Sequence, residues 1–180
     1  MWPVVCAGTM LVIFTGILPD RGGPYLVVGS APVPLPQPAI PAGLTPPEVN
    51  SIQRHRNPKS MVAEALKIAE LRLINVLDNA RNGRYKLAVD ELAVYAALVS
   101  YADGVTRAIP SQKRSDREGC LKRIEQALFR QSPRLENVTR ELPFDLRDPA
   151  ASVADLVKRI RLRAINDLLG GGSAIRVPEQ

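Results

Sequence analysis

The chain has 180 residues and little of the chemistry on which metal sites, disulfide frameworks and most active sites depend. It contains one histidine and two cysteines, with neither a CxxC pair nor an HExxH motif. A disulfide-framed module and a structural zinc site are therefore not expected, and no cofactor is implied. Cys120 falls within a helical pattern, where we expect a small buried hydrophobe rather than a reactive thiol.

Aromatic side chains are also scarce. They make up 4% of the chain, whereas hydrophobic residues as a whole make up 46%. A core must then be built mainly from Ala, Leu, Val and Ile, which suits helices packed on helices. The composition predicts an all-α fold, a small antiparallel bundle of four or five helices behind an N-terminal apolar segment and a Pro-rich linker.

Proline and charge divide the chain into two regions. Nine of the 16 prolines lie between Pro19 and Pro47. Residues 54–180, in contrast, hold all but one of the 24 Lys and Arg and all but two of the 18 Asp and Glu. This division predicts four parts: a signal peptide or membrane anchor (1–30), a Pro-rich flexible linker (31–56), a helical bundle domain (57–170) and a disordered tail (171–180).

The N-terminal segment is uncharged from Trp2 to Leu18, about the length of a signal-peptide core or a short membrane anchor. It lacks the usual basic residues before the apolar run, and small residues at 28–30 would suit cleavage. Three explanations stay open: a removed signal peptide, a retained anchor, and a wrongly assigned translation start. The first two predict a protein that is exported (periplasmic or secreted) or membrane-anchored, and the third a cytoplasmic one.

The linker alternates proline with small or aliphatic residues as far as Val49. Proline removes the backbone donors that helices and sheets need and favours an extended polyproline II conformation. We interpret residues 31–56 as a spacer. The alternative is that the Pro-rich run at 34–38 is a ligand for an aromatic-lined groove on another protein.

The helical domain begins with an antiparallel pair. Asn57 and Pro58 supply an N-cap and a proline at the first helical position, and apolar residues then recur at spacings of three and four until Asn82–Gly83 ends the helix. A second stripe over residues 88–102 predicts a returning helix that Pro110 ends. Its tyrosines are spaced for packing in a core.

Two further helices are expected. Ser115 and Glu118 form a capping-box pattern, and a heptad rhythm then continues over residues 121–142, straight through Pro133. Because proline disfavours a helix interior, this rhythm predicts either a kinked helix or two coaxial pieces. A last helix is expected from a cap at Ser152 to a run of three glycines.

At the first hairpin a family resemblance appears. Residues 83–88, Gly-Arg-Tyr-Lys-Leu-Ala, are similar to the turn and early second helix of a tetratricopeptide repeat, with a glycine, an aromatic and an alanine at matching offsets. The wider stretch from Gly83 to Gly171 resembles a set of uncharacterised exported bacterial helical proteins. The two resemblances imply a helical-hairpin fold and no particular activity.

The final helix carries the densest cluster of positive charge in the chain, four cations within residues 158–163. A basic cluster there is a candidate for contact with phosphate or anionic lipid, although a solvated face that complements the C-terminal end of the helix dipole accounts for the same pattern. A smaller basic patch, Arg54–Arg56 with Lys59, lies at the end of the linker, and its His55 is not assigned a catalytic role. The candidate anion-binding residues are Lys158, Arg159, Arg161 and Arg163.

The sequence shows no recognisable set of catalytic residues. The sequence offers no nucleophile beside a base, no paired carboxylates across a cleft and no glycine-rich loop that opens a helix. The function expected is therefore a non-catalytic structural or protein-interaction module whose partner is another protein, with membrane contact only through the N-terminal segment. Nucleic acid and small-molecule substrates are not expected as partners. The alternative is a binder of anionic surfaces, nucleic acid or lipid headgroups, through the basic final helix.

Overall fold

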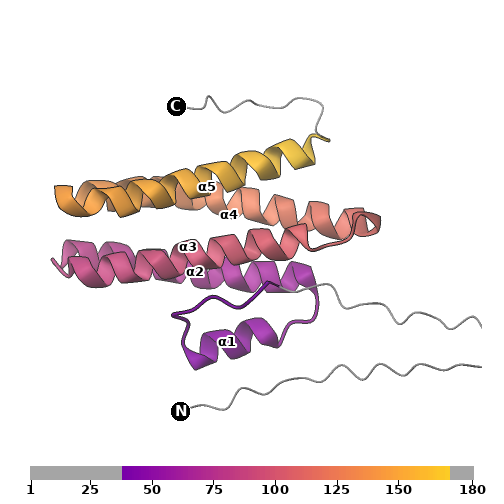
Figure 1. Ribbon diagram of the computed structural model, residues 1–180, viewed down its shortest axis with the longest axis horizontal. Coiled ribbons are helices and arrows are strands. Elements are labelled where there is room, and N and C mark those ends of the chain that lie inside the picture. Colours follow the sequence, from indigo (N-terminus) through magenta and orange to yellow (C-terminus); the bar gives the residue numbers. More distant parts are fainter. Residues whose placement is uncertain (1–37, 171–180) are drawn as a thin grey trace, which may run out of the picture. The chain divides into compact units, whose positions relative to one another are not determined.

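Every regular element in residues 38–170, the part of the chain that the computed structural model describes, is a helix (Figure 1). The predicted all-α fold is therefore confirmed. The predictions for residues 1–30, for the first part of the linker and for the tail at 171–180 lie outside the described residues. The helices are α1 (Pro46–Gln53), α2 (Pro58–Arg81), α3 (Tyr85–Arg107), α4 (Arg114–Glu141) and α5 (Arg147–Leu168), with short 3-10 turns at Ser111–Lys113 and Phe144–Leu146.

The first hairpin, α2 with α3, forms as its sequence predicts. The Asn57 side chain accepts a hydrogen bond from the backbone N–H of Lys59 at 2.8 Å, and Pro58 occupies the first helical position. At the other end Gly83 has a φ of +70°, a left-handed conformation that glycine adopts without strain. This turn returns the chain into α3 as an antiparallel partner.

Two hairpins are stacked on each other. Within each pair, α2 with α3 and α4 with α5, the helices are antiparallel and share extensive contacts. Between the pairs, α4 lies along α2 and α5 lies along α3, and the helices in each of these contacts run in the same direction (Figure 1). The bundle is therefore a two-layer stack of helical hairpins.

The core between the layers is aliphatic, as the composition requires. Leu73, Leu98 and Leu128, from three different helices, are completely buried. Among the larger polar groups there, the Tyr95 hydroxyl donates a 3.1 Å hydrogen bond to the side-chain oxygen of the buried Gln131, which joins α3 to α4. Cys120 is buried, as expected.

The prediction of a flexible linker up to residue 56 is wrong for its second half. Residues 46–53 form α1, whose Ile52 is fully buried against the bundle, and Ile40 and Leu44 pack on the same core. The backbone N–H and the hydroxyl of Thr45 both donate to the Glu48 carboxylate at 2.8 Å, which caps the helix at its start. Pro46 and Pro47 occupy the first turn of α1, where the backbone N–H that proline lacks would have no helical partner.

The second hairpin differs from its predicted boundaries at three points. Helix α4 begins at Arg114, directly after a 3-10 turn, so Ser115 is not its cap. It continues unbroken through Pro133, which excludes two separate pieces. Helix α5 begins at Arg147 rather than at Ser152, because Pro149 falls within its first turn and is tolerated there.

Candidate functional site

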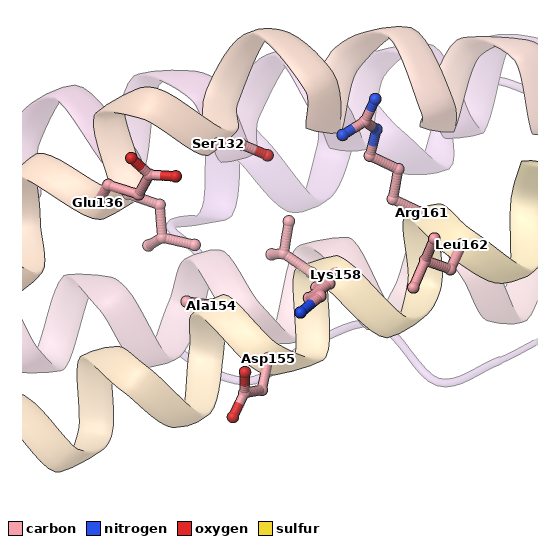
Figure 2. Close-up of a pocket in the computed structure, with 9 residues that line it drawn as sticks. Ser132, Glu136, Ala154, Asp155, Lys158, Arg161 and Leu162 are labelled. Carbon is pink, nitrogen blue, oxygen red and sulfur yellow. The ribbon is translucent and has the colours of Figure 1, made fainter. Parts of the chain in front are cut away.

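A groove of about 410 Å³ lies between α4 and α5 on the side of the second hairpin that faces away from the first (Figure 2). Its position follows from the sequence of both helices, because each one turns its apolar stripe toward the core and its mixed face outward. A second hollow of about 370 Å³ shares Glu136, Ala154 and Asp155 with it and extends the groove toward the start of α5. The groove is lined by Ser132, Leu135, Glu136, Ala154, Asp155, Val157, Lys158, Arg161 and Leu162.

The groove has an apolar floor between two oppositely charged ends. Leu135 and Val157 are buried beneath it, and Leu162 is half-buried at its margin. Figure 2 shows Glu136 and Asp155 toward one end and Arg161 toward the other. Along α5 the lining passes from the acidic Asp155 to the basic Lys158 and Arg161, while Arg140 of α4 lines the extension of the groove beside Asp155.

The basic end also carries an exposed aromatic ring. Phe129 on α4 is 59% exposed, and the guanidinium of Arg161 lies over its ring at 4.6 Å from the centroid. Arg161 is also held by a hydrogen bond to Glu125 at 3.2 Å. A cation held over an aromatic face leaves both the ring edge and the aliphatic stem open to contact.

The four predicted anion-binding residues are not brought together. Arg161 pairs with Glu125 as described, and Arg163 donates to Asp103 at 3.1 Å on α3, on the other side of α5. Asp103 is buried and is also bound by Arg107 at 2.9 Å. Only Lys158 and Arg159 are exposed without an ion pair to any described residue.

The smaller basic patch is likewise divided. Lys59 lies 2.9 Å from the Asp116 carboxylate on α4, and this contact holds the pKa of Asp116 below its ordinary value. Arg54 and Arg56 are exposed. The pair ties the start of α2 to the start of α4, so it holds the two layers in register rather than presenting charge to a ligand.

Sequence reasoning did not identify Phe129, Glu136 and Asp155 as site residues. A pattern in the sequence can place each of them on an outward helix face, but it cannot show that α4 and α5 bring these faces together. The partners of the basic cluster were missed for the same reason, because Glu125 and Asp103 come from different helices.

The polar groups of the groove are partly engaged within their own helix. Its two hydroxyls are held by helix carbonyls, since Ser132 donates to Leu128 at 2.7 Å and Thr139 donates to Leu135 at 3.2 Å. Within residues 38–170 no group of His, Cys, Asp and Glu could hold a metal ion. What the lining offers is apolar contact and charge pairing.

No family model, curated protein or solved structure matches this chain. A search of the described helices finds none that combines the length and the hydropathy of a membrane span.

Proposed function

We propose that this protein is a non-catalytic helical interaction module that binds a helical segment of a partner protein in the α4–α5 groove. One observation carries the proposal: within residues 38–170, a segment covers the outer face of one hairpin and none covers that of the other. Residues 38–53, with Ile52 fully buried, lie against α2 and α3 on the side opposite the second hairpin. In the described residues no comparable segment lies over the α4–α5 groove.

Helix α1, on the covered face of the α2–α3 hairpin, shows within this protein how a helix packs on the outer face of a hairpin. There, an amphipathic helix buries one large aliphatic side chain and fixes itself by ion pairs at its end. The α4–α5 groove offers an apolar floor at Leu135 and Val157 and charged side chains toward both ends. A helix laid in a hydrophobic groove is a common mode of peptide recognition.

The charges of the groove specify the direction of the partner helix. A helix carries positive charge at its N-terminus and negative charge at its C-terminus, so its N-terminus belongs at Asp155 and Glu136 and its C-terminus at Lys158 and Arg161. The partner therefore runs parallel to α5. A basic residue near its start and an acidic residue about two turns later, with apolar residues between them, would complete the match.

Site-specific photo-crosslinking in cells tests this proposal. A photoreactive amino acid replaces Leu162 in the full chain, and the same replacement at the exposed Ser100 of α3 is the matched control. We expect an adduct from position 162 only, with the crosslink mapped by mass spectrometry to an amphipathic helix of the partner. Equal adducts from both positions, no adduct, or a partner segment that is not an amphipathic helix would each refute the proposal.

A charge swap sharpens the same experiment. Asp155→Lys combined with Lys158→Glu cancels the electrostatic direction of the groove, because Glu136 and Arg161 keep their signs, and it leaves the net charge of the protein unchanged. Both side chains are exposed and form no ion pair with a described residue, so the fold does not depend on them. We expect the swap to lower the adduct yield severalfold, because like charges would then face each other.

The location of the module is a separate proposal that rests on sequence. The uncharged run from Trp2 to Leu18 supports export or tethering to a membrane. Fractionation of a C-terminally tagged full chain, with the mature N-terminus read by intact mass, distinguishes the three explanations. A soluble cytoplasmic protein with an intact N-terminus would refute both export and tethering.

A further inference from the structure

A separate hollow, distinct from the two that form the α4–α5 groove, lies on a different flank, between α2 and α4. It has a volume of about 270 Å³ and is lined on the α2 side by Leu66, Lys67 and Glu70, and on the α4 side by Arg123, Gln126 and Arg130. None of these residues takes part in the α4–α5 groove. The hollow is therefore independent of the proposed partner site.

The two arginines of this hollow have no ion-pair partner among the described residues. Arg123 and Arg130 are exposed and form no hydrogen bond or ion pair with a described residue. Lys67 forms a long ion pair with Glu64, at 4.0 Å, across one turn of α2, and its side chain remains 70% exposed. The one acid in the lining, Glu70, is already engaged, because Arg134 donates to it at 2.6 Å. Two arginines without a described ion pair, and a lysine with only a long one, thus share a single hollow.

This arrangement contrasts with the predicted basic cluster on α5. There, Arg161 and Arg163 are each tied to an acid on a neighbouring helix. On the α2–α4 flank the positive charges come from two helices and line one hollow. Arg123 and Arg130 are seven residues apart, which places them on the same face of α4, two turns apart, with Gln126 between them.

Such a set of donors fits an oxyanion. Two guanidinium groups offer paired N–H donors to oxygens, the Lys67 ammonium offers a point charge, and the Gln126 amide adds a neutral donor. A monoanionic carboxylate would leave most of these donors unused, whereas the three oxygens of a phosphoryl group can accept from all of them. We propose that this hollow binds a phosphate or phosphomonoester group.

The source of the phosphoryl group is either a soluble anion or a lipid headgroup. Both present the same chemistry to Lys67, Arg123 and Arg130, and exposed charge pairs of this kind weaken as ionic strength rises. The proposal differs from the sequence-based alternative in its location: the anion belongs on the α2–α4 flank, and the cations of α5 are not required.

Titration of the full chain with inorganic phosphate at low salt tests the site. Binding is followed by calorimetry and by the NMR signal of the Gln126 side-chain amide. Arg123→Gln combined with Arg130→Gln is the test variant, and Lys158→Gln combined with Arg159→Gln is the control, since it removes the same charge from the predicted α5 site. All four side chains are exposed without described ion pairs, so we expect both variants to fold.

We expect the test variant to bind phosphate about tenfold more weakly, because it loses two charge-assisted donors, and the control to bind within about twofold of the natural protein. Flotation with phosphatidylcholine vesicles, with and without phosphatidic acid, then identifies the source. Phosphate binding together with flotation only on the vesicles with phosphatidic acid assigns a lipid headgroup, and phosphate binding without flotation on either vesicle assigns a soluble ligand. Equal weakening in the two variants, no saturable binding of phosphate, or binding of a poly-glutamate peptide in its place would overturn the proposal.

Discussion

The two hairpins of this protein share one architecture but differ in what covers their outer faces. On the α2–α3 hairpin, residues 38–53 bury Ile52 completely and pack Ile40 and Leu44 onto the core. On the α4–α5 hairpin the corresponding face leaves Phe129 exposed beside a groove of about 410 Å³. The difference lies outside the hairpins themselves, in a segment that reaches only one of them.

This difference shows how a stack of hairpins ends. Each hairpin buries its inner face against the next, so the two terminal faces need either a cover or a polar surface. The first hairpin has a cover, fixed by Arg72, which bonds to Glu48 of α1 and to Glu91 of α3. The second has an outer surface of both polar and apolar side chains, which is stable in contact with water and is also available to a partner. The proposed partner helix would be to α4 and α5 what α1 is to α2 and α3.

The largest expected effect comes from weakening the packing of the cover, residues 38–53, on the first hairpin. Ile52→Ala removes a fully buried side chain, and we expect it to lower the free energy of unfolding by about 3 kcal/mol. Leu162→Ala, on the α4–α5 hairpin, removes a half-buried side chain and should cost less than about 1 kcal/mol in the isolated protein. Urea denaturation measures both. Equal costs would show that the two faces are not different in the way described.

The second effect concerns the ion pairs that fix the cover. Arg72 is only 11% exposed, and Arg72→Met would leave the two carboxylates of Glu48 and Glu91 unpaired. Because the group is partly solvated, we expect a loss of about 1–2 kcal/mol rather than the larger cost of a fully buried pair. Amide hydrogen exchange should show the loss first in α1, and uniform loss over all helices would contradict this account.

The same ion pairs give the cover a pH dependence. Burial acts to raise the pKa of Glu48, but hydrogen bonds from Arg72 and Thr45 outweigh it and hold the pKa below the ordinary value of 4.5. A carboxyl whose pKa is lowered in the folded state stabilises the protein above its unfolded pKa, and that stability is lost as the pH falls through the folded pKa. We therefore expect protection of the α1 amides to fall below pH 4.5, and Glu48→Gln to remove this pH dependence.

The sequence predicts the first hairpin almost residue by residue, because its signals are local. Asn57 with Pro58 and Asn82 with Gly83 determine the ends of α2 through bonds and conformations within a few residues. The same kind of signal preceded α1, since Thr45 and Glu48 stand three residues apart around Pro46. Because the surrounding segment is rich in proline, this helix-start signal was interpreted as part of an extended linker, although proline in the first turn favours a helix start.

The candidate site could be predicted only in part, because its geometry depends on distant contacts. Lys158 and Arg161 could be found as charged residues of the last helix. That Arg161 and Arg163 turn toward opposite neighbours follows from Glu125 and Asp103, which lie on other helices. Helical spacing within α5 does not contain this information. The α2–α4 hollow is of the same kind, since it joins Lys67 to residues far along the chain.

The smallest expected effect concerns a difference between the first helices of the two hairpins, α2 and α4. α2 contains no proline after its first position, whereas α4 continues through Pro133 next to the groove residue Ser132. Proline cannot donate to the carbonyl of Phe129 four residues before it, so α4 lacks one hydrogen bond at the basic end of the groove. Pro133→Ala restores that donor at an exposed position.

We expect Pro133→Ala to raise the free energy of unfolding by about 1 kcal/mol, less than the cost of proline in a peptide helix, because the native helix already accommodates the ring. Thermal unfolding measures the gain. If the variant is more stable but crosslinks less through position 162, the proline serves the groove by shaping α4 for its partner. If stability and crosslinking are both unchanged, the proline is neutral, and the difference between the two outer faces rests on the cover alone.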